Sequence, residues 1–211
     1  MKIFAVSDSH ISHSNILIYT NRPWLRPGDI VDGKFISNEI RTTRTEEMDN
    51  ELIRRWNEVV SKDDTVYHLG DFVFAPRKGG EAKIILILEQ LNGKIHLIKG
   101  NHDHAKQHFW ERHGVTFYPD SYTIINGVML CHYPTYVEVH DDYKDRTKMQ
   151  RLKEHFKRIY NKNNCRYLLY GHSHNWISPQ PRSWNCSVDV NDFRPIEVDF
   201  NLDKPIINNL C

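Results

Sequence analysis

The sequence is organised around an apolar strand that runs directly into a polar turn. Ile95-His96-Leu97-Ile98 is apolar enough for a strand covered on both faces, and Gly100-Asn101-His102-Asp103 follows it. In open α/β sheets, ligands bind outside the carboxyl ends of the strands, so this turn is a predicted binding site. The same arrangement recurs four more times along the chain, which makes a chance occurrence a poor explanation.

Five predicted strands, at residues 2–7, 65–69, 94–99, 128–131 and 166–170, end in turns that carry metal-binding groups. Carboxylates and imidazoles without a thiolate suit manganese, iron or zinc better than a soft metal or an iron–sulfur cluster. Such a set exceeds what one four-coordinate zinc needs, but it suits two metals that share a carboxylate, as in sites for phosphoryl transfer. The predicted ligands are Asp8, His10, Asp71, Asn101, His132, His172 and His174.

The remaining pattern predicts a mixed, layered α/β protein in one domain of residues 1–211. Helices are expected over 45–59, 81–91, 104–113 and 144–161, the first with Thr45 as its N-cap, and a short one near 16–17. Further strands are expected near 115–118, 121–125, 184–190 and 196–200, with Asn126-Gly127 as a hairpin turn. Residues 21–45 show little periodicity and are interpreted as an irregular insertion, which at such a length is usually functional.

Composition limits the classes of function. The formal net charge of +1 over 211 residues favours neither a protein that binds nucleic acid through its overall charge nor a membrane binder. No stretch approaches the roughly 20 apolar residues of a transmembrane helix. The apolar run at the N-terminus is too short for a signal peptide. The 4 cysteines lie far apart, so no disulfide framework is expected and the predicted setting is the reducing cytoplasm. The 13 histidines are in excess of average usage, which agrees with metal binding.

Taken together, the five turns resemble the calcineurin-like metallophosphoesterase superfamily, whose pattern reads D-x-H, G-D, G-N-H-D/E, H and G-H-x-H. Every block is intact, over residues 3–174. The stretches Asn21-Arg22-Pro23-Trp24, Tyr67-His68-Leu69-Gly70-Asp71-Phe72 and Asn185-Cys186-Ser187-Val188-Asp189 resemble the small single-domain branch found in bacteria and their phages. The resemblance implies a four-layer α/β/β/α sandwich of two mixed sheets flanked by helices.

The resemblance also implies roles for the site residues. One metal would be held by Asp8, His10, Asp71 and His174, and the other by Asp71, Asn101, His132 and His172, with Asp71 bridging. His102 would face the phosphate, and Asp103 would hydrogen-bond His102 and fix its tautomer. The nucleophile would be a hydroxide that bridges the metals. Two divalent ions are expected, Mn²⁺ first, with iron, zinc and nickel compatible with the same ligands.

Several residues admit two interpretations. His13 and Asn15 are predicted to contact substrate or to cap the following helix, and Arg22 to bind a phosphate or to pair with an acid of the insertion. His68 lies inside a predicted strand, where a structural role is favoured over catalysis. The segment 144–166 holds nine lysines and arginines, which form a solvated helix face or a surface for nucleic acid.

The predicted function is a dinuclear metal-dependent phosphoesterase that hydrolyses a phosphodiester or a phosphomonoester, with a small nucleotide-like substrate favoured. The alternative enzyme is a nuclease or an end-processing phosphatase acting on DNA or RNA. An alternative of another class is a catalytically silent binding or scaffold protein, which would be expected to lack ligands or His102; none is missing. The substrate, the native metal and the oligomeric state stay open at this point.

Overall fold

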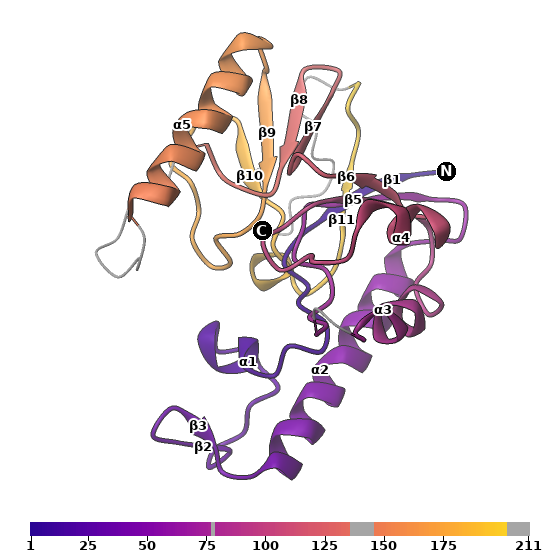
Figure 1. Ribbon diagram of the computed structural model, residues 1–211, viewed down its shortest axis with the longest axis vertical. Coiled ribbons are helices and arrows are strands. Elements are labelled where there is room, and N and C mark those ends of the chain that lie inside the picture. The colour runs from indigo at the N-terminus through magenta and orange to yellow at the C-terminus, as the bar shows by residue number, and fades with distance from the viewer. Residues whose placement is uncertain (77–78, 136–145, 202–211) are drawn as a thin grey trace.

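A computed structural model describes residues 1–76, 79–135 and 146–201, without the side chains of 146–149. Its core is formed by two sheets (Figure 1). The first has the strand order β11-β1-β4-β5-β6, in which only β11 runs antiparallel, and the second has the order β10-β9-β8-β7, in which only the β7–β8 pair is antiparallel. The strands of the first sheet are β1 (Ile3–Val6), β4 (Thr65–His68), β5 (Lys94–Ile98), β6 (Thr116–Tyr118) and β11 (Ile196–Val198). Those of the second are β7 (Tyr122–Ile125), β8 (Val128–Cys131), β9 (Tyr167–Tyr170) and β10 (Ser183–Asn185).

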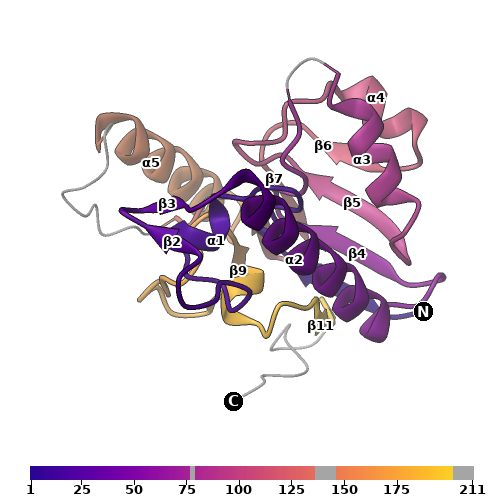
Figure 2. The ribbon, with the colours of Figure 1, turned by 90° about the horizontal axis from the view of Figure 1, so that it is seen from below.

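Helices cover the outer faces of both sheets (Figures 1 and 2). The first sheet packs against α2 (Asn38–Val59), α3 (Glu81–Leu88) and α4 (Gln107–Arg112), and the second against α5 (Arg146–Lys162). Three apolar clusters fill the spaces between these layers: one under α2 to α4, one between the two sheets, and one under α5. The predicted four-layer α/β/β/α sandwich is therefore confirmed.

The alternation of side chains along the strands explains why both sheets are covered on both faces. In β1, Phe4 and Val6 point into the cluster under the helices, whereas Ala5 points into the space between the sheets. In β8, Leu130 faces the other sheet and Met129 faces α5. Both faces need apolar residues, which is why these strands read as continuous apolar runs rather than as alternating patterns.

The segment 21–45 is more regular than the sequence predicts. It contains a two-stranded hairpin of β2 (Ile30–Val31) and β3 (Lys34–Phe35) and the first two turns of α2. The helix begins at Asn38 rather than at Thr45, because Ser37 is extended and its hydroxyl accepts a hydrogen bond from the backbone N–H of Ile40 at 3.1 Å. Periodicity missed this start because the apolar face of α2 begins only at Met48, where the helix reaches the sheet.

The strand predicted over 184–190 is also shorter than expected. β10 ends at Asn185, and Val188–Val190 form a 3₁₀ turn. The Asn185 side chain accepts a hydrogen bond from the backbone N–H of Ser187 at 2.9 Å, which bends the chain out of the sheet. A further helix, α1, is short (Ile16–Tyr19) and follows the β1 turn. Within the described ranges, no helix is long and apolar enough to cross a membrane.

Candidate metal centre

The turns after β1, β4, β5, β8 and β9 meet at one end of the sandwich, although they come from two different sheets. They form two groups of metal-binding side chains, and within each group the ligand atoms lie within 4.8 Å of one another. One group consists of Asp8, His10 and His174, and the other of Asp71, His132 and His172. The structure thus brings together six of the seven predicted ligands in the two sets that the resemblance implies.

The seventh predicted ligand, Asn101, lies beside the second group. Its Oδ1 is 3.0 Å from Nε2 of His132 and 3.0 Å from Nδ1 of His172. Since Nδ1 of His132 donates to the carbonyl of Leu69 at 2.7 Å, Nε2 of this neutral ring carries a lone pair. Two lone pairs that face each other at 3.0 Å repel, and a cation between them removes the repulsion. The donor set therefore fits a metal ion.

Asp71 lies between the two groups. Its Oδ2 is 3.5 Å from Nε2 of His10 in the first group and 3.6 Å from Nε2 of His132 in the second. This is the place that a carboxylate shared by two metals would have to take.

Unpaired polar atoms give a second indication of metal binding. Both ring nitrogens of His10 and Nε2 of His172 are buried without a hydrogen-bond partner among the described residues. A buried polar atom without a partner costs about 1–3 kcal/mol, so such atoms are rare unless a ligand satisfies them. An imidazole binds a metal through one nitrogen, so one nitrogen of His10 and Nε2 of His172 fit the role of metal ligands.

Burial controls the charges of the site. Desolvation raises the pKa of Asp8 to about 7, helped by the charge of Asp71 and opposed by that of His174. Desolvation lowers the pKa of His132 to about 3 and holds those of His10 and His172 well below their usual range. These three rings are therefore neutral, which is the form that binds a metal. The fourth ring, His174, is the exception: desolvation lowers its pKa, but the hydrogen bond to Asp189 and the charge of Asp8 raise it above the ordinary value.

The backbone at these turns adopts a conformation that is unusual for residues other than glycine. Asp8, His10, Asp71, His172 and His174 have φ values of 55°, 46°, 57°, 70° and 45°, in the left-handed region. Each costs of the order of 1–2 kcal/mol and turns the side chain sharply out of the strand direction. Glycines allow the turns to pack closely, since a Cβ on Gly70 would lie 2.7 Å from Cα of Gly100.

Asp103 does not have the role that the resemblance implies. Its carboxylate accepts hydrogen bonds from the backbone N–H groups of Asp71 (2.8 Å), Phe72 (3.1 Å) and Gly100 (2.8 Å), rather than from the His102 ring. The expected Asp103–His102 pair is therefore wrong, because three orphan amides of the β4 and β5 turns take both carboxylate oxygens. Asp103 ties the two turns together, and burial with repulsion from Asp71 raises its pKa to about 7.

His102 lies at the edge of the centre. Its backbone N–H donates to Oδ1 of Asp71 at 2.8 Å, and its half-exposed ring has its centre 5.2 Å from that of His10. Nε2 of His102 is 4.0 Å from Oδ2 of Asp71. The ring is thus close to the metal-binding groups without belonging to either.

A cleft of about 740 Å³ opens over the two groups. His13 and Asn15 both line it. The His13 ring stacks on Phe74 with 3.9 Å between the ring centres, and Asn15 stands at the N-cap position of α1 without a capping hydrogen bond from its side chain. The Asn15 side chain therefore does not cap α1, and both residues stay candidates for substrate contact.

Arg22 does not line the cleft. Its guanidinium is completely buried, pairs with Asp189 through Nε (2.9 Å) and NH2 (3.1 Å), and donates to the backbone carbonyls of Asp8 (2.8 Å) and Ser9 (2.9 Å). The prediction that Arg22 contacts substrate is therefore wrong, because its donors are used beneath the site to support the β1 turn. Its acidic partner, Asp189, also lies outside residues 21–45, where a partner for Arg22 was expected.

Asp189 is a site residue that the sequence reading missed. Besides Arg22, it accepts a hydrogen bond from Nδ1 of His174 at 2.7 Å, which leaves Nε2 of that ring for the first group. Burial alone would raise the pKa of Asp189, but the hydrogen bond from His174 and the charge of Arg22 hold it well below its usual range. The only signal in the sequence was its place in the Asn185–Asp189 stretch.

His68 has the structural role that was favoured. It is buried, contacts the Ser9 hydroxyl at 2.9 Å, and accepts a hydrogen bond from the backbone N–H of Gly70.

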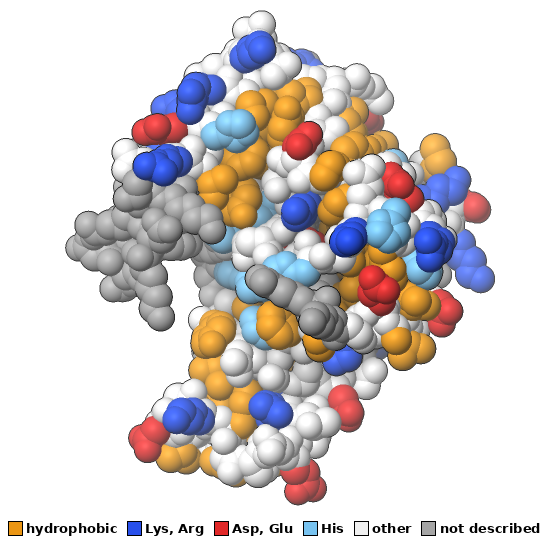
Figure 3. All heavy atoms as spheres, in the orientation of Figure 1, with side chains coloured by type: hydrophobic (Ala, Val, Ile, Leu, Met, Phe, Trp, Pro, Cys, Tyr) orange, Lys and Arg blue, Asp and Glu red, His pale blue; other side chains and the backbone are white. Residues whose placement is uncertain are grey.

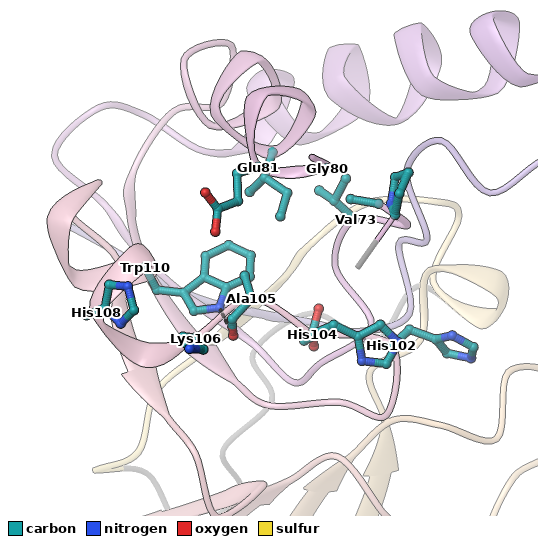
Figure 4. Close-up of a pocket in the computed structure, with 13 residues that line it drawn as sticks. Val73, Gly80, Glu81, His102, His104, Ala105, Lys106, His108 and Trp110 are labelled. Carbon is teal, nitrogen blue, oxygen red and sulfur yellow. Dashed lines mark hydrogen bonds between the residues drawn. The ribbon is translucent and has the colours of Figure 1, made fainter. Parts of the chain in front are cut away.

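A smaller cavity of about 230 Å³ adjoins the centre (Figure 4). His102 lines both this cavity and the cleft, so the two spaces adjoin at this residue. The figure shows the carboxylate of Glu81 directed across the cavity toward Trp110, with His104 and Lys106 on the same side as His102.

Comparisons with known proteins agree with this geometry. Residues 1–176 match the model of the calcineurin-like phosphoesterase family. The chain is 31% identical to the uncharacterized protein MJ1445 of Methanocaldococcus jannaschii, over 94% of this chain and 88% of that protein. The crystal structure of a protein of unknown function from Aquifex aeolicus, AQ665, is similar with a TM-score of 0.62 and 26% identity, over 93% of this chain and 95% of that one. The chain therefore belongs to the calcineurin-like phosphoesterases, a family of metal-dependent hydrolases of phosphate esters.

Proposed function

We propose that the protein is a dinuclear phosphodiesterase for a small, nucleotide-like substrate. The observation that carries the proposal is the pair of ligand groups with Asp71 between them and with unpaired imidazole nitrogens buried in both. One ion would be held by Asp8, His10, His174 and Asp71, and the other by Asp71, Asn101, His132 and His172. Oxygen and imidazole donors make Mn²⁺ our choice, and iron, zinc or nickel would be accepted by the same set.

Two divalent cations at these positions would supply a nucleophilic water at neutral pH and offset the charge of the phosphate. The chain itself supplies the positioning. Asp103 joins the β4 and β5 turns, Leu69 and Asp189 fix the tautomers of His132 and His174, and the left-handed residues aim the ligands inward.

His102 is the residue placed to act on the substrate directly. A phosphate above Asp71 would lie beside the half-exposed His102 ring, which can donate a hydrogen bond to a phosphate oxygen or a proton to the departing oxygen. The backbone bond of His102 to Asp71 holds the ring at this distance.

The cleft favours an extended substrate over a small monoester. A volume of about 740 Å³ is within the range of sites for drug-sized ligands. Tyr19, Phe74 and Trp176 line it. Tyr19 and Phe74 are exposed and Trp176 is half-buried, and such rings offer a nucleobase a surface on which to stack. A longer nucleic acid is the alternative substrate, supported by exposed cations of α5 such as Lys157, Arg158 and Lys162.

The test is hydrolysis of bis-(p-nitrophenyl) phosphate and p-nitrophenyl phosphate by metal-stripped protein before and after addition of Mn²⁺. We expect turnover only with metal, faster on the diester, and lost in Asp71→Asn. His102→Ala should reduce kcat by about 10²–10⁴-fold while two ions still bind. The control variant is His155→Ala, which removes an exposed histidine of α5 and should keep the wild-type rate.

Two outcomes would contradict the proposal. Absence of turnover by protein that binds two ions would favour the binding-protein interpretation. A fluorescent oligonucleotide cleaved faster than either ester, with a rate that falls steeply between 50 and 200 mM salt, would favour the nuclease.

A further inference from the structure

A second groove adjoins the cleft at the metal centre. Asn15 and Tyr19 line both, so α1 forms the ridge between them. The second groove has a volume of about 600 Å³ and is bounded by the β2–β3 hairpin and the first turn of α2, with Lys34, Ser37 and Arg41 among its lining residues. In Figure 3, histidines gather in the hollow at the middle of the molecule, and both basic and acidic side chains lie on the lobe below it, which α1 and the hairpin form.

The groove is cationic and lacks a carboxylate. Lys34 and Arg41 are its charged lining residues, and both are exposed. Other arginines of the same part of the chain are paired with acids: Arg26 and Arg44 with Glu47, and Arg54 with Glu51. Among the described residues, neither Lys34 nor Arg41 forms an ion pair. Their charges are therefore left for a ligand.

An anion with several acceptor oxygens matches this lining. A guanidinium binds a phosphate through two parallel hydrogen bonds, an ammonium adds a point charge, and neutral polar groups such as Ser37 and Asn38 complete the contacts. Tyr19, whose side chain is 70% exposed, stands between this groove and the metal centre, where its ring can contact a base or a sugar.

We propose that the Lys34–Arg41 groove binds a second phosphate of the substrate. This inference rests on the proposed function, since it assumes that the bond to be cleaved lies over the metal centre. The preferred substrate is then a short phosphodiester of the nucleotide kind that carries an additional terminal phosphate. The segment 21–45, which supplies both cations through β3 and α2, would be the element that decides this preference.

The test compares two substrates that differ only in the terminal phosphate, adenylyl-(3′→5′)-adenosine and its 5′-phosphorylated form. The wild-type enzyme should prefer the phosphorylated dinucleotide by about tenfold or more in kcat/KM, a factor typical of charge-assisted contacts. In Lys34→Ala/Arg41→Ala the preference should fall to near one, and hydrolysis of bis-(p-nitrophenyl) phosphate, which lacks a second anionic group, should be retained. The matched control is Lys62→Ala/Arg112→Ala, which removes the same charge at exposed positions outside the groove and should keep the preference.

A binding measurement separates this inference from the proposed function. Calorimetric titration of the phosphorylated dinucleotide into His102→Ala, with and without the Lys34→Ala/Arg41→Ala pair, should show an affinity loss of about tenfold. If this loss is seen but no variant or wild-type protein hydrolyses any ester, the groove stands and the phosphodiesterase proposal fails. If the preference for the terminal phosphate is absent from the wild type, or is equal in the wild type and the groove variant, the inference is overturned.

Discussion

His132 and His174 show how single residues prepare the centre. In each ring Nδ1 donates to a fixed acceptor, the carbonyl of Leu69 for His132 and the carboxylate of Asp189 for His174. The donated proton selects the tautomer and leaves Nε2 with a lone pair directed at the ligand group. The two rings are therefore oriented without a metal, and the carbonyl of Leu69 and the carboxylate of Asp189 fix that orientation.

Asp189 offers a test of this orientation. Asp189→Asn should lower the affinity for the metal by about 10–100-fold, because an amide can present its donor end to Nδ1 and no longer selects one tautomer. The affinity is measured by competition with a chelating dye. The substitution also leaves the buried Arg22 charge without its partner, which should lower the stability by about 3–5 kcal/mol.

The stability loss is controlled by Arg22→Gln. This variant breaks the same ion pair but keeps the bond from His174 to Asp189. Both variants should melt at lower temperature, and Asp189→Asn should lose more metal affinity than Arg22→Gln, whose effect on the metal is limited to the lost support of the β1 turn. Equal losses of affinity in the two variants would show that the ion pair acts through the fold alone.

Among the elements, α2 consists of two halves with different surroundings. Its C-terminal half packs Met48, Leu52 and Trp56 on the first sheet, and its N-terminal half reaches out beside the hairpin, where Arg44 pairs with Asp29 at 2.6 Å. The outer half has no sheet beneath it, so its helicity depends on the Ser37 cap and on such pairs.

The cap predicts a measurable cost. Ser37→Ala should lower the free energy of unfolding by about 0.5–2 kcal/mol, since the N–H of Ile40 loses its acceptor. Thr43→Ala, at an exposed position of the same helix, should leave the stability unchanged or raise it slightly, because alanine has the higher helix propensity. Chemical denaturation of both variants checks the difference. If the two variants had the same free energy of unfolding, the Ser37 cap would not stabilise α2, and the stable part of the helix would begin nearer to Thr45.

At the scale of the whole molecule, the metal centre joins the two sheets. Asp8, His10, Asp71 and Asn101 follow strands of the first sheet, whereas His132, His172 and His174 follow strands of the second. Each ligand group contains residues from both sheets. An ion in either group would therefore crosslink the sandwich at the end where its strands stop.

Removal of the metal should accordingly lower the melting temperature. A ligand present at 100 times its Kd stabilises the folded state by about 2.7 kcal/mol, so restoring Mn²⁺ to chelated protein should raise Tm by several degrees. The gain should be larger at pH 8 than at pH 6. Asp8 has a pKa of about 7, so at pH 6 it is mostly protonated in the metal-free fold and an ion must displace that proton.

Scanning calorimetry at both pH values checks this prediction. Asp71→Asn, which removes the carboxylate between the groups, should show a smaller rise in Tm, and the exposed Asp120→Asn should behave as the wild type. An unchanged Tm on chelation would mean that the two sheets do not depend on the ions for their packing.

The candidate metal-binding side chains and the layers of the fold could be predicted from the sequence. Strand periodicity and the chemistry of a side chain are local properties, so apolar runs ending in Asp8, Asp71 or His132 could be recognised without knowing their neighbours in space. The four-layer arrangement followed from the resemblance carried by the same turns. The strand and helix positions that followed from strong apolar runs are close to those observed, with β4 and β8 as examples.

Tertiary structure decided which groups pair beneath the ligands. Arg22 and Asp189 are 167 positions apart, and Asp103 binds the amide of Asp71 from 32 positions away. A carboxylate or guanidinium takes the partner that burial brings within 3 Å, and in a buried site every unpaired donor or acceptor competes for it. That competition placed Asp103 on backbone amides instead of on His102, drew Arg22 under the β1 turn, and made Asp189 the partner of His174.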